Sequence, residues 1–514
     1  MKLFNSVQFN KPKRNKFDLS HERKFSMKMG TLTPFFVQEV IPGDSIRLNT
    51  EMFMRFQPMI APVMHRIRTK TDLYFVPNRL IWDNWGKFIT GGDLGTDNPI
   101  HPYIAYSEAT KANFPLKGLA DYLGVPPLGT STMNQTINIS ALPFRAYQLI
   151  WNEYYRDQNL QAELDISKTD GNQDAISGQS TMLTTLRQRA WEKDYFTSAL
   201  PWAQKGGSVA SPVSGAVTPG TLQASEIRKV TDNTLASSGP LTSSLGQENV
   251  NGNEPTYRSL TGEGSVEGEV NINELRRSVR LQEWLERNAR AGSRYIESIL
   301  AHFGVLSSDA RLQRPEYLGG GVNPVVISEV LSTYQNADDT GYPQGTMSGH
   351  GISTGNITGF KRKFEEHGFI IGIMTVLPRT AYQQGLPKHF SRFDKFDYAW
   401  PSFAQLGEQE IKLKELYLDT AASNAEETFG YQSRYAEYKY APTTVHGDMR
   451  TNLAFWHEGR IFQNKPVLNE QFIQADPDKR IFAVTDQNED EIICQLYNRV
   501  DALRPLPYFN TPTL

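Results

Sequence analysis

Three stretches between residues 32 and 77 carry the alternating pattern of β-strands, and no helical pattern separates them. A turn at Pro42-Gly43-Asp44 divides the first stretch from the second, in which apolar and polar residues alternate up to Phe56. Pro58 and Pro62 then interrupt the chain before the third stretch, MHRIRTKTDLYFVP at residues 64–77. Strands that follow one another without a helical crossover predict an antiparallel sheet.

The third stretch predicts a strand that is buried on one face only. In an extended chain, one face holds His65, Ile67, Thr69, Thr71, Leu73 and Phe75. The other face holds Met64, Arg66, Arg68, Lys70, Asp72 and Tyr74. The cations on this second face are expected to meet either solvent or a polyanion, and the pattern alone leaves both open.

Helical patterns fill the middle of the chain, and strands return towards its end. Helices are expected over residues 78–90, 142–157, 183–196 and 271–304, the last of them interrupted at Gly292. Further strands are expected over residues 323–333, 369–378 and 480–487. The 514 residues exceed what one core usually supports, so we expect several domains or one domain with large insertions. Strands at both ends favour one β architecture with excursions in its loops.

Two segments are poor in residues that could build a core. Residues 1–30 are basic, which suits either a solvated tail or an arm that contacts nucleic acid. Residues 205–270 are rich in Ser, Thr, Gly, Asn and Pro, and Tyr257 is their only aromatic residue. Such a segment predicts a linker or disordered loop, or else an ordered surface projection that partner chains stabilise.

Composition excludes several classes of protein. The net charge of −3 means that any contact with nucleic acid must come from local patches. Cys494 is the single cysteine, so an intramolecular disulfide and a cysteine-based zinc site are excluded, and we expect a buried thiol. The sequence has neither a signal-peptide pattern nor an apolar run of about 18 residues. We therefore expect a soluble protein in a reducing compartment, without a membrane span.

No catalytic or metal-binding motif stands out. The nine histidines are scattered, and the spacings of zinc proteases, phosphate-binding loops and serine hydrolases are missing. His446 and Asp448 are more typical of a hydrogen-bonded loop than of a metal site. We therefore expect no enzymatic activity, no metal site and no cofactor.

Two stretches suggest contact with nucleic acid. YQSRYAEYKYAP, residues 431–442, interleaves four tyrosines with Arg434 and Lys439, and GFKRKFEEHG, residues 359–368, contains three consecutive cations. Aromatic rings stack on bases while cations hold phosphates. The alternatives are a half-buried tyrosine-rich strand and a solvated charge cluster.

A set of ordered blocks gives the chain a specific resemblance. They include DLSHERKFSMKMGTLTPFFVQEVIPGD at 18–44, LPFRAYQLIWNEYYRDQNL at 142–160, YLGGGVNPVVISEVLST at 317–333 and FGYQSRYAEYKYAPTTVHGDMR at 429–450. With these blocks the chain resembles the major capsid protein of the Microviridae, which are bacteriophages with single-stranded DNA genomes. It is most similar to the gokushovirus branch.

The resemblance implies a mainly β fold, an eight-stranded antiparallel jelly roll with long inter-strand insertions that contain helices. It also implies self-assembly into a small icosahedral T=1 shell around circular single-stranded DNA, in a virion made in the cytoplasm of a bacterial host. Small DNA-binding, scaffolding and pilot virion proteins are implied as partners, together with a host surface receptor that could be a glycan. Residues 31–204 and 271–514 would then form the jelly roll and its excursions.

The resemblance also assigns candidate residues. Residues 205–270 would form a projection at the threefold axes that serves host attachment, represented by Lys205, Ser214, Thr231, Asn249, Tyr257 and Val270. Candidate DNA contacts are Lys11, Lys13, Arg14, Lys16, Arg66, Arg68, Lys70, Arg434 and Lys439. Two alternatives remain open: a soluble carbohydrate-binding or carbohydrate-processing jelly-roll protein, and a single-stranded DNA-binding protein that acts alone.

Overall fold

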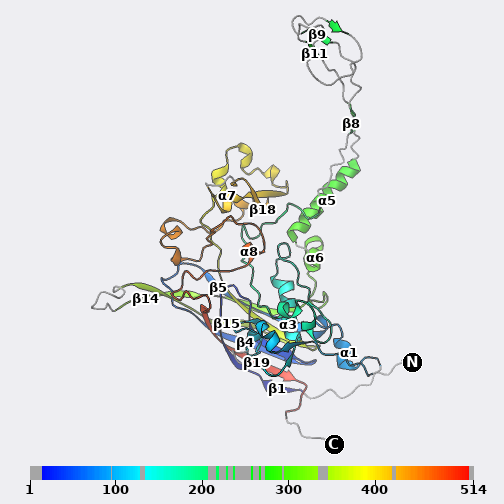
Figure 1. The fold of residues 1–514 in the computed structure, drawn as a ribbon, viewed down its shortest axis with the longest axis vertical. Coiled ribbons are helices and arrows are strands. Elements are labelled where there is room, and N and C mark those ends of the chain that lie inside the picture. The colour runs from blue at the N-terminus through cyan, green and yellow to red at the C-terminus, as the bar shows by residue number, and fades with distance from the viewer. Residues whose placement is uncertain are drawn as a thin grey trace. The chain divides into compact units, whose positions relative to one another are not determined.

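The computed structural model describes residues 14–93, 95–127, 133–206, 272–291, 294–333, 345–419 and 424–508, and the backbone of five short strands between residues 216 and 267 (Figure 1). Contacts within the chain divide it into two units. One consists of residues 1–203 and 291–514, and the other of residues 204–290.

One antiparallel sheet of the first unit, here called sheet A, joins the two ends of the chain. Its strand order is β1-β19-β4-β15-β14, and β2 pairs with β19 beyond the end of β1. The strands are β1 (Asn15–Asp18), β2 (His21–Met27), β4 (Ser45–Phe56), β14 (Val326–Leu331), β15 (Met347–Lys363) and β19 (Ile492–Arg504). In Figure 1, blue β1 lies beside red β19, which places β19 inside the sheet between β1 and β4.

The second large sheet, here called sheet B, is also antiparallel and has the order β13-β5-β16-β3. Its strands are β3 (Thr33–Val40), β5 (Ile67–Pro77), β13 (Glu316–Pro324) and β16 (Gly368–Pro378). The inner faces of sheets A and B share one hydrophobic core, to which each sheet contributes large side chains such as Met54, Phe56, Leu73, Phe75 and Met374. The predicted antiparallel, mainly β architecture is thus confirmed.

A helical layer covers the outer face of sheet B. Ile371 and Ile373 of β16 point away from sheet A and pack in a second core with Phe144, Tyr147 and Ile150. These three residues belong to α3 (Leu142–Ile150), where their three-residue spacing forms one apolar face and Pro143 fits the first turn. The layer also contains α1 (Trp85–Thr90), α2 (Leu119–Leu123), α4 (Gln179–Thr184) and the π-helical turn η3 (Trp151–Tyr155).

Smaller elements surround these sheets. A third core joins β17 (Glu408–Lys412), β18 (Thr428–Ser433), α7 (Leu413–Leu416) and α8 (Glu470–Ile473). A separate hairpin consists of β6 (Tyr103–Tyr106) and β7 (Ile137–Ser140), and α6 (Tyr295–Phe303) ends at Gly304 in the left-handed region. The 3-10 turns are η1 (Asn78–Leu80), η2 (Glu108–Asn113), η4 (Gln173–Ala175), η5 (Lys388–Ser391), η6 (Lys395–Asp397), η7 (Pro401–Phe403), η8 (Ala436–Tyr438), η9 (Gly447–Arg450) and η10 (Ala454–Trp456).

The unit of residues 204–290 contains most of helix α5 (Ile272–Ala291) and the short strands β8 to β12. These strands are β8 (Ala216–Thr218), β9 (Ile227–Lys229), β10 (Leu235–Ser237), β11 (Thr256–Arg258) and β12 (Ser265–Glu267). β9 pairs with β10 and β11, and β8 pairs with β12. Of the residues chosen to represent the projection, Ser214, Thr231, Asn249 and Val270 lie outside the described residues.

Two predicted elements are wrong. Residues 183–196 do not form a helix beyond Thr184, because the backbone that follows bonds to distant segments: Leu32 N–H donates to Arg187 O and Trp191 N–H donates to Ile473 O. Residues 480–487 do not form a strand either. Their apolar side chains, Ile481 and Phe482, enter the core between the sheets from a turn.

Two further expectations change in detail. Within the segment expected to be a basic arm, residues 15–27 form β1 and β2, because Lys16 and Lys24 alternate with the partly buried Phe17 and Phe25. The strand predicted at 64–77 is not buried on one face only. From Thr71 to Pro77 both faces of β5 are buried, since the helical layer covers the face that was expected to be exposed.

Candidate nucleic-acid interface

The outer face of sheet A is exposed, and strand alternation places the same kinds of side chain on it repeatedly. Along β4, buried residues alternate with Arg47, Glu51, Phe53 and Arg55, all of which are exposed. Phe53 keeps 41% of its surface exposed, which is high for a phenylalanine in a strand. The period of two thus turns a polar and aromatic set of side chains away from the core.

The register of the central strands brings residues from distant parts of the sequence together on this face. Phe53 is opposite Gln495 of β19 and Thr354 of β15, and the Arg55 guanidinium lies 5.8 Å from the centroid of the Phe53 ring. Tyr497 of β19, 39% exposed, is opposite Glu51. Two aromatic rings therefore lie among charged side chains on neighbouring strands.

Positive charge exceeds negative charge on this face. The register places these cations there: Lys16, Lys24, Arg47, Arg55, Lys361, Lys363 and Arg499. It places these carboxylates there: Asp18, Glu22, Glu51 and Asp501. Lys16 Nζ lies 2.8 Å from Asp501, and Lys24 Nζ lies 3.3 Å from Glu22, so two of the carboxylates are already compensated. The hydrogen bond from Lys16 lowers the pKa of Asp501.

This combination suits a single-stranded polyanion. Cations neutralise phosphates without regard to sequence, and exposed aromatic rings give unpaired bases a surface to stack on. Within the described residues, no group of three or more His, Cys, Asp or Glu side chains is placed to hold a metal ion.

Most of the cations predicted from the sequence lie elsewhere. Lys11 and Lys13 lie outside the described residues, and Arg14 is beside Gly43 at the edge of sheet A. Lys16 does lie on the outer face of sheet A. Arg434 and Lys439 lie beside the third core, where Lys439 Nζ donates to Arg434 O. The predicted cations therefore do not form one surface.

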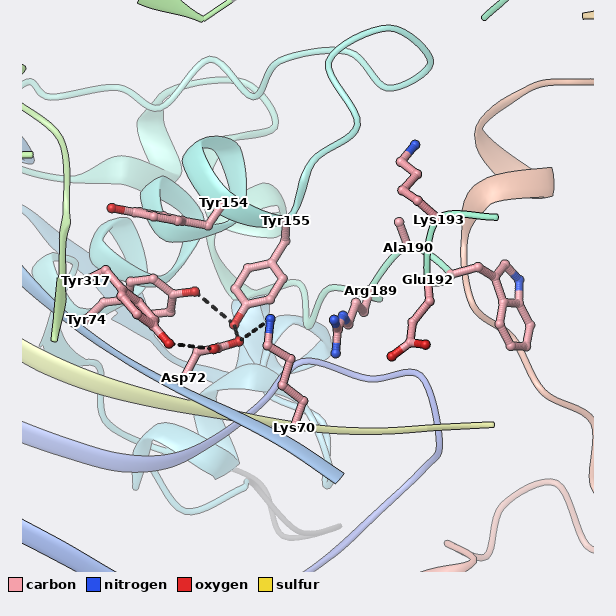
Figure 2. A pocket seen from close by; sticks show the side chains of 11 residues that line it. Lys70, Asp72, Tyr74, Tyr154, Tyr155, Arg189, Ala190, Glu192, Lys193 and Tyr317 are labelled. Carbon is pink, nitrogen blue, oxygen red and sulfur yellow. Dashed lines mark hydrogen bonds and ion pairs between the residues drawn. The ribbon is translucent and has the colours of Figure 1, made fainter. Parts of the chain in front are cut away.

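Arg68 and Lys70 belong to β5 of sheet B, and Arg66 immediately precedes this strand. Lys70 lines a cavity of about 530 Å³ between the edge of sheet B and the helical layer (Figure 2). Its Nζ lies 3.4 Å from the carboxylate of the buried Asp72, which also accepts a hydrogen bond of 2.9 Å from Tyr155. Burial raises the pKa of Tyr155, which keeps its hydroxyl a donor. Lys70 therefore compensates a buried carboxylate, and its contact with DNA stays a prediction.

Sequence reasoning missed Arg47, Arg55 and Arg499 as members of the candidate interface, and also both aromatic rings. It did single out Lys361 and Lys363. The alternation around Arg47 and Arg55 was visible in the sequence, but the neighbouring cations come from β15 and β19, hundreds of residues away. Cys494, as expected, is a buried free thiol, and burial raises its pKa.

Comparison with known proteins gives matches along nearly the whole chain. Residues 5–514 match the family described as "Capsid protein (F protein)". Capsid protein VP1 of Chlamydia phage 1 is 36% identical over 583 aligned positions, which cover 98% of this chain and 96% of the relative. Capsid protein VP1 of Bdellovibrio phage phiMH2K is 36% identical, covering 97% and 95%, and that of Spiroplasma virus 4 is 27% identical, covering 99% and 97%. Among the described residues, no helix has the length and apolar character needed to cross a bilayer.

Proposed function

We propose, from the premise that this chain belongs to the capsid protein (F protein) family, that its copies form a small icosahedral T=1 shell around circular single-stranded DNA. Membership in the family makes the chain a major capsid protein of a virion and not an enzyme. The resemblance to gokushovirus capsid proteins is confirmed by the three relatives. The carbohydrate-processing and lone DNA-binding alternatives are set aside, because the family match covers nearly the whole chain.

The strand order supports an eight-stranded jelly roll. Taken as one strand interrupted at Leu19 and Ser20, β1 and β2 give sheet A the order β1/β2-β19-β4-β15, with β14 as a hairpin extension. Strands that follow one another in the sequence then alternate between sheets A and B, except that β5 and β13 both belong to sheet B. Each sheet contributes four strands to the jelly roll. The long excursions are residues 78–315, between β5 and β13, and residues 379–491, between β16 and β19.

The exposed outer face of sheet A is the observation that carries the DNA part of the proposal. We assign this face to the interior of the shell, against packaged DNA. Its excess of cations contrasts with the net charge of −3 for the whole chain, so the positive charge is local. Phe53 and Tyr497 add stacking surface that a purely electrostatic contact would not need.

A photo-crosslinking residue in place of Phe53 tests both the formation of the shell and the orientation of sheet A towards DNA. The substituted chain is produced in cells that express the phage genome, so that particles can form. We expect particles in electron micrographs and, after illumination, protein joined to nuclease-sensitive DNA. The same probe in place of the buried Phe75 is the control and should give no DNA adduct. A chain that stays monomeric in those cells would contradict the shell. Particles without a DNA adduct at position 53 would contradict only the orientation of sheet A.

We further assign residues 205–270 to a projection at the threefold axes that attaches the virion to a host surface receptor such as a glycan. The polar composition of the segment supports this, since such a segment becomes ordered most readily where several copies meet. Small DNA-binding, scaffolding and pilot proteins are the other proposed partners, with synthesis in the bacterial cytoplasm. Deleting residues 207–268 should leave particle formation intact and abolish adsorption to cells. Loss of particles while the rest still folds would refute this assignment.

A further inference from the structure

An exposed aromatic patch lies on the excursion between β16 and β19, away from both large sheets. Its members are Phe390 (61% exposed), Phe393 (90%), Phe396 (52%), Tyr398 (53%), Trp400 (48%), Leu406 (65%), Tyr438 (52%) and Tyr440 (58%). At about 200 Å² for a large side chain, the exposed fractions of these residues add up to roughly 950 Å² of side-chain surface. Apolar patches on monomeric proteins rarely exceed a few hundred Å², and one partner in a typical stable complex buries about 800 Å².

The patch is held in shape by its own polar contacts. The Arg392 guanidinium lies 4.3 Å from the centroid of the Tyr438 ring and 5.8 Å from that of Tyr398, and it pairs with Glu437 at 3.1 Å. Trp400 Nε1 donates to Lys395 O at 2.8 Å. Because the rings of Tyr398, Trp400 and Tyr438 are held before any partner arrives, these three side chains lose little conformational entropy on binding.

A groove adjoins the patch and extends its apolar surface. It has a volume of about 1230 Å³, and its lining includes Phe390, Tyr438 and Tyr440 of the patch, together with Leu386 and Pro387. Its central charges are paired within the chain. Lys388 Nζ lies 3.6 Å from Glu415, and Arg392 pairs with Glu437. Apolar protein surface can therefore cover the groove without leaving these charges unpaired, whereas a polyanion would have to compete with Glu415 and Glu437 for Lys388 and Arg392.

We propose that the aromatic patch and its groove form a contact surface between two copies of this chain. The proposal rests on the shell function and adds the surface that the copies share. Its area matches one partner's share of a stable interface, and its aromatic composition is that of interface centres. A second copy is the occupant that a shell supplies in the highest number. Phe393, the most exposed member, is the expected anchor of the contact.

A photo-crosslinking residue in place of Phe393 tests the contact in assembled particles. We expect a product of twice the 58.1 kDa chain mass, whose joined peptides come from two copies. A probe that joins DNA or another virion protein, or that joins nothing in well-formed particles, would overturn the proposal. If the probe at position 393 gives one of these results, a DNA adduct from separate particles that carry the probe at position 53 would still support the shell function. A failure of the unsubstituted chain to form particles would instead count against the shell function.

Substitution gives a second test that does not depend on crosslinking. Phe393→Asp should reduce the particle yield at least tenfold without changing the melting temperature of the unassembled chain, because the side chain is 90% exposed. Phe393→Leu, which keeps an apolar side chain, is the matched control and should retain most of the yield. Normal assembly of Phe393→Asp would overturn the proposal.

Discussion

Sheets A and B are both antiparallel and share one core, yet their outer faces differ completely. Along β4 of sheet A, buried and exposed residues alternate up to Phe56. Along β16 of sheet B, every residue except Phe369 is buried. The sequences reflect this difference, since RLNTEMFMRF alternates whereas FIIGIMTVLP is continuously apolar. A continuous apolar run marks a strand covered on both sides, and an alternating run marks a strand with a face left for a partner.

The largest effect should come from removing apolar volume under the helical layer. Ile371→Ala in β16 should lower the free energy of unfolding by about 2–5 kcal/mol, because the side chain is fully buried on the outer face of sheet B. Ile493→Ala in β19 makes the same change on the outer face of sheet A, where the side chain is 50% exposed. It should cost less than about 1 kcal/mol. Chemical denaturation of the two variants measures both values.

Equal losses of stability in these two variants would contradict the conclusion that the outer face of sheet B is covered and that of sheet A is exposed. A large loss for Ile493→Ala alone would mean that the outer face of sheet A is covered within the isolated chain. The assignment of that face to DNA would then fail.

A smaller effect is expected when charge is removed from the two sheets. Replacing Arg47, Arg55 and Arg499 with Gln should weaken binding to a single-stranded oligonucleotide about tenfold. It should also reduce the salt dependence of log K by about 2, since each lost phosphate contact contributes about 0.7. The comparison variant replaces Arg68 of sheet B and Arg66, which immediately precedes β5, with Gln and should change neither value. Similar losses in both variants would show that DNA binding is not confined to sheet A.

The smallest effect concerns pH and His65, which precedes β5. Burial, aided by the nearby Arg480, holds the pKa of this imidazole at about 4, although Nε2 donates to Arg379 O at 2.6 Å. The unfolded chain therefore takes up a proton between pH 6.5 and 4 that the folded chain does not. Stability should fall through this window as pH decreases, by about 1 kcal/mol, since the ring is partly exposed. His65→Gln should flatten the dependence of melting temperature on pH, and an unchanged profile would exclude this role.

Sequence reasoning worked where the decisive contacts are local. The turn at Pro42-Gly43-Asp44 forms, with Asp44 N–H donating to Ile41 O, and the spacing of Phe144, Tyr147 and Ile150 produces α3. It failed where distant segments decide. The backbone after Thr184 pairs with residues near Leu32 and Ile473, and no local pattern reports those partners.

The residues of the candidate interface divide in the same way, into those that a local pattern reveals and those that only strand pairing brings together. Lys361 and Lys363 were visible as a charge run, but an isolated run does not show which face of a sheet it occupies. Arg499 and Tyr497 join Arg47 and Phe53 only through the pairing of β19 with β4. The ion pair of Lys70 was not predicted, because no pattern in the sequence shows that Asp72, two residues away on the same face, is buried.

The central position of β19 also bears on synthesis. Asn15 pairs with Arg504 and β4 pairs with β19, so sheet A cannot be completed until a strand far along the chain has been made. Sheet B needs only residues up to Pro378 and can form earlier. A chain cut short before Ile492 would expose the edges of β2 and β4 and could not complete the face assigned to DNA. A chain without β19 would therefore lack both a complete sheet A and the surface proposed to engage the genome.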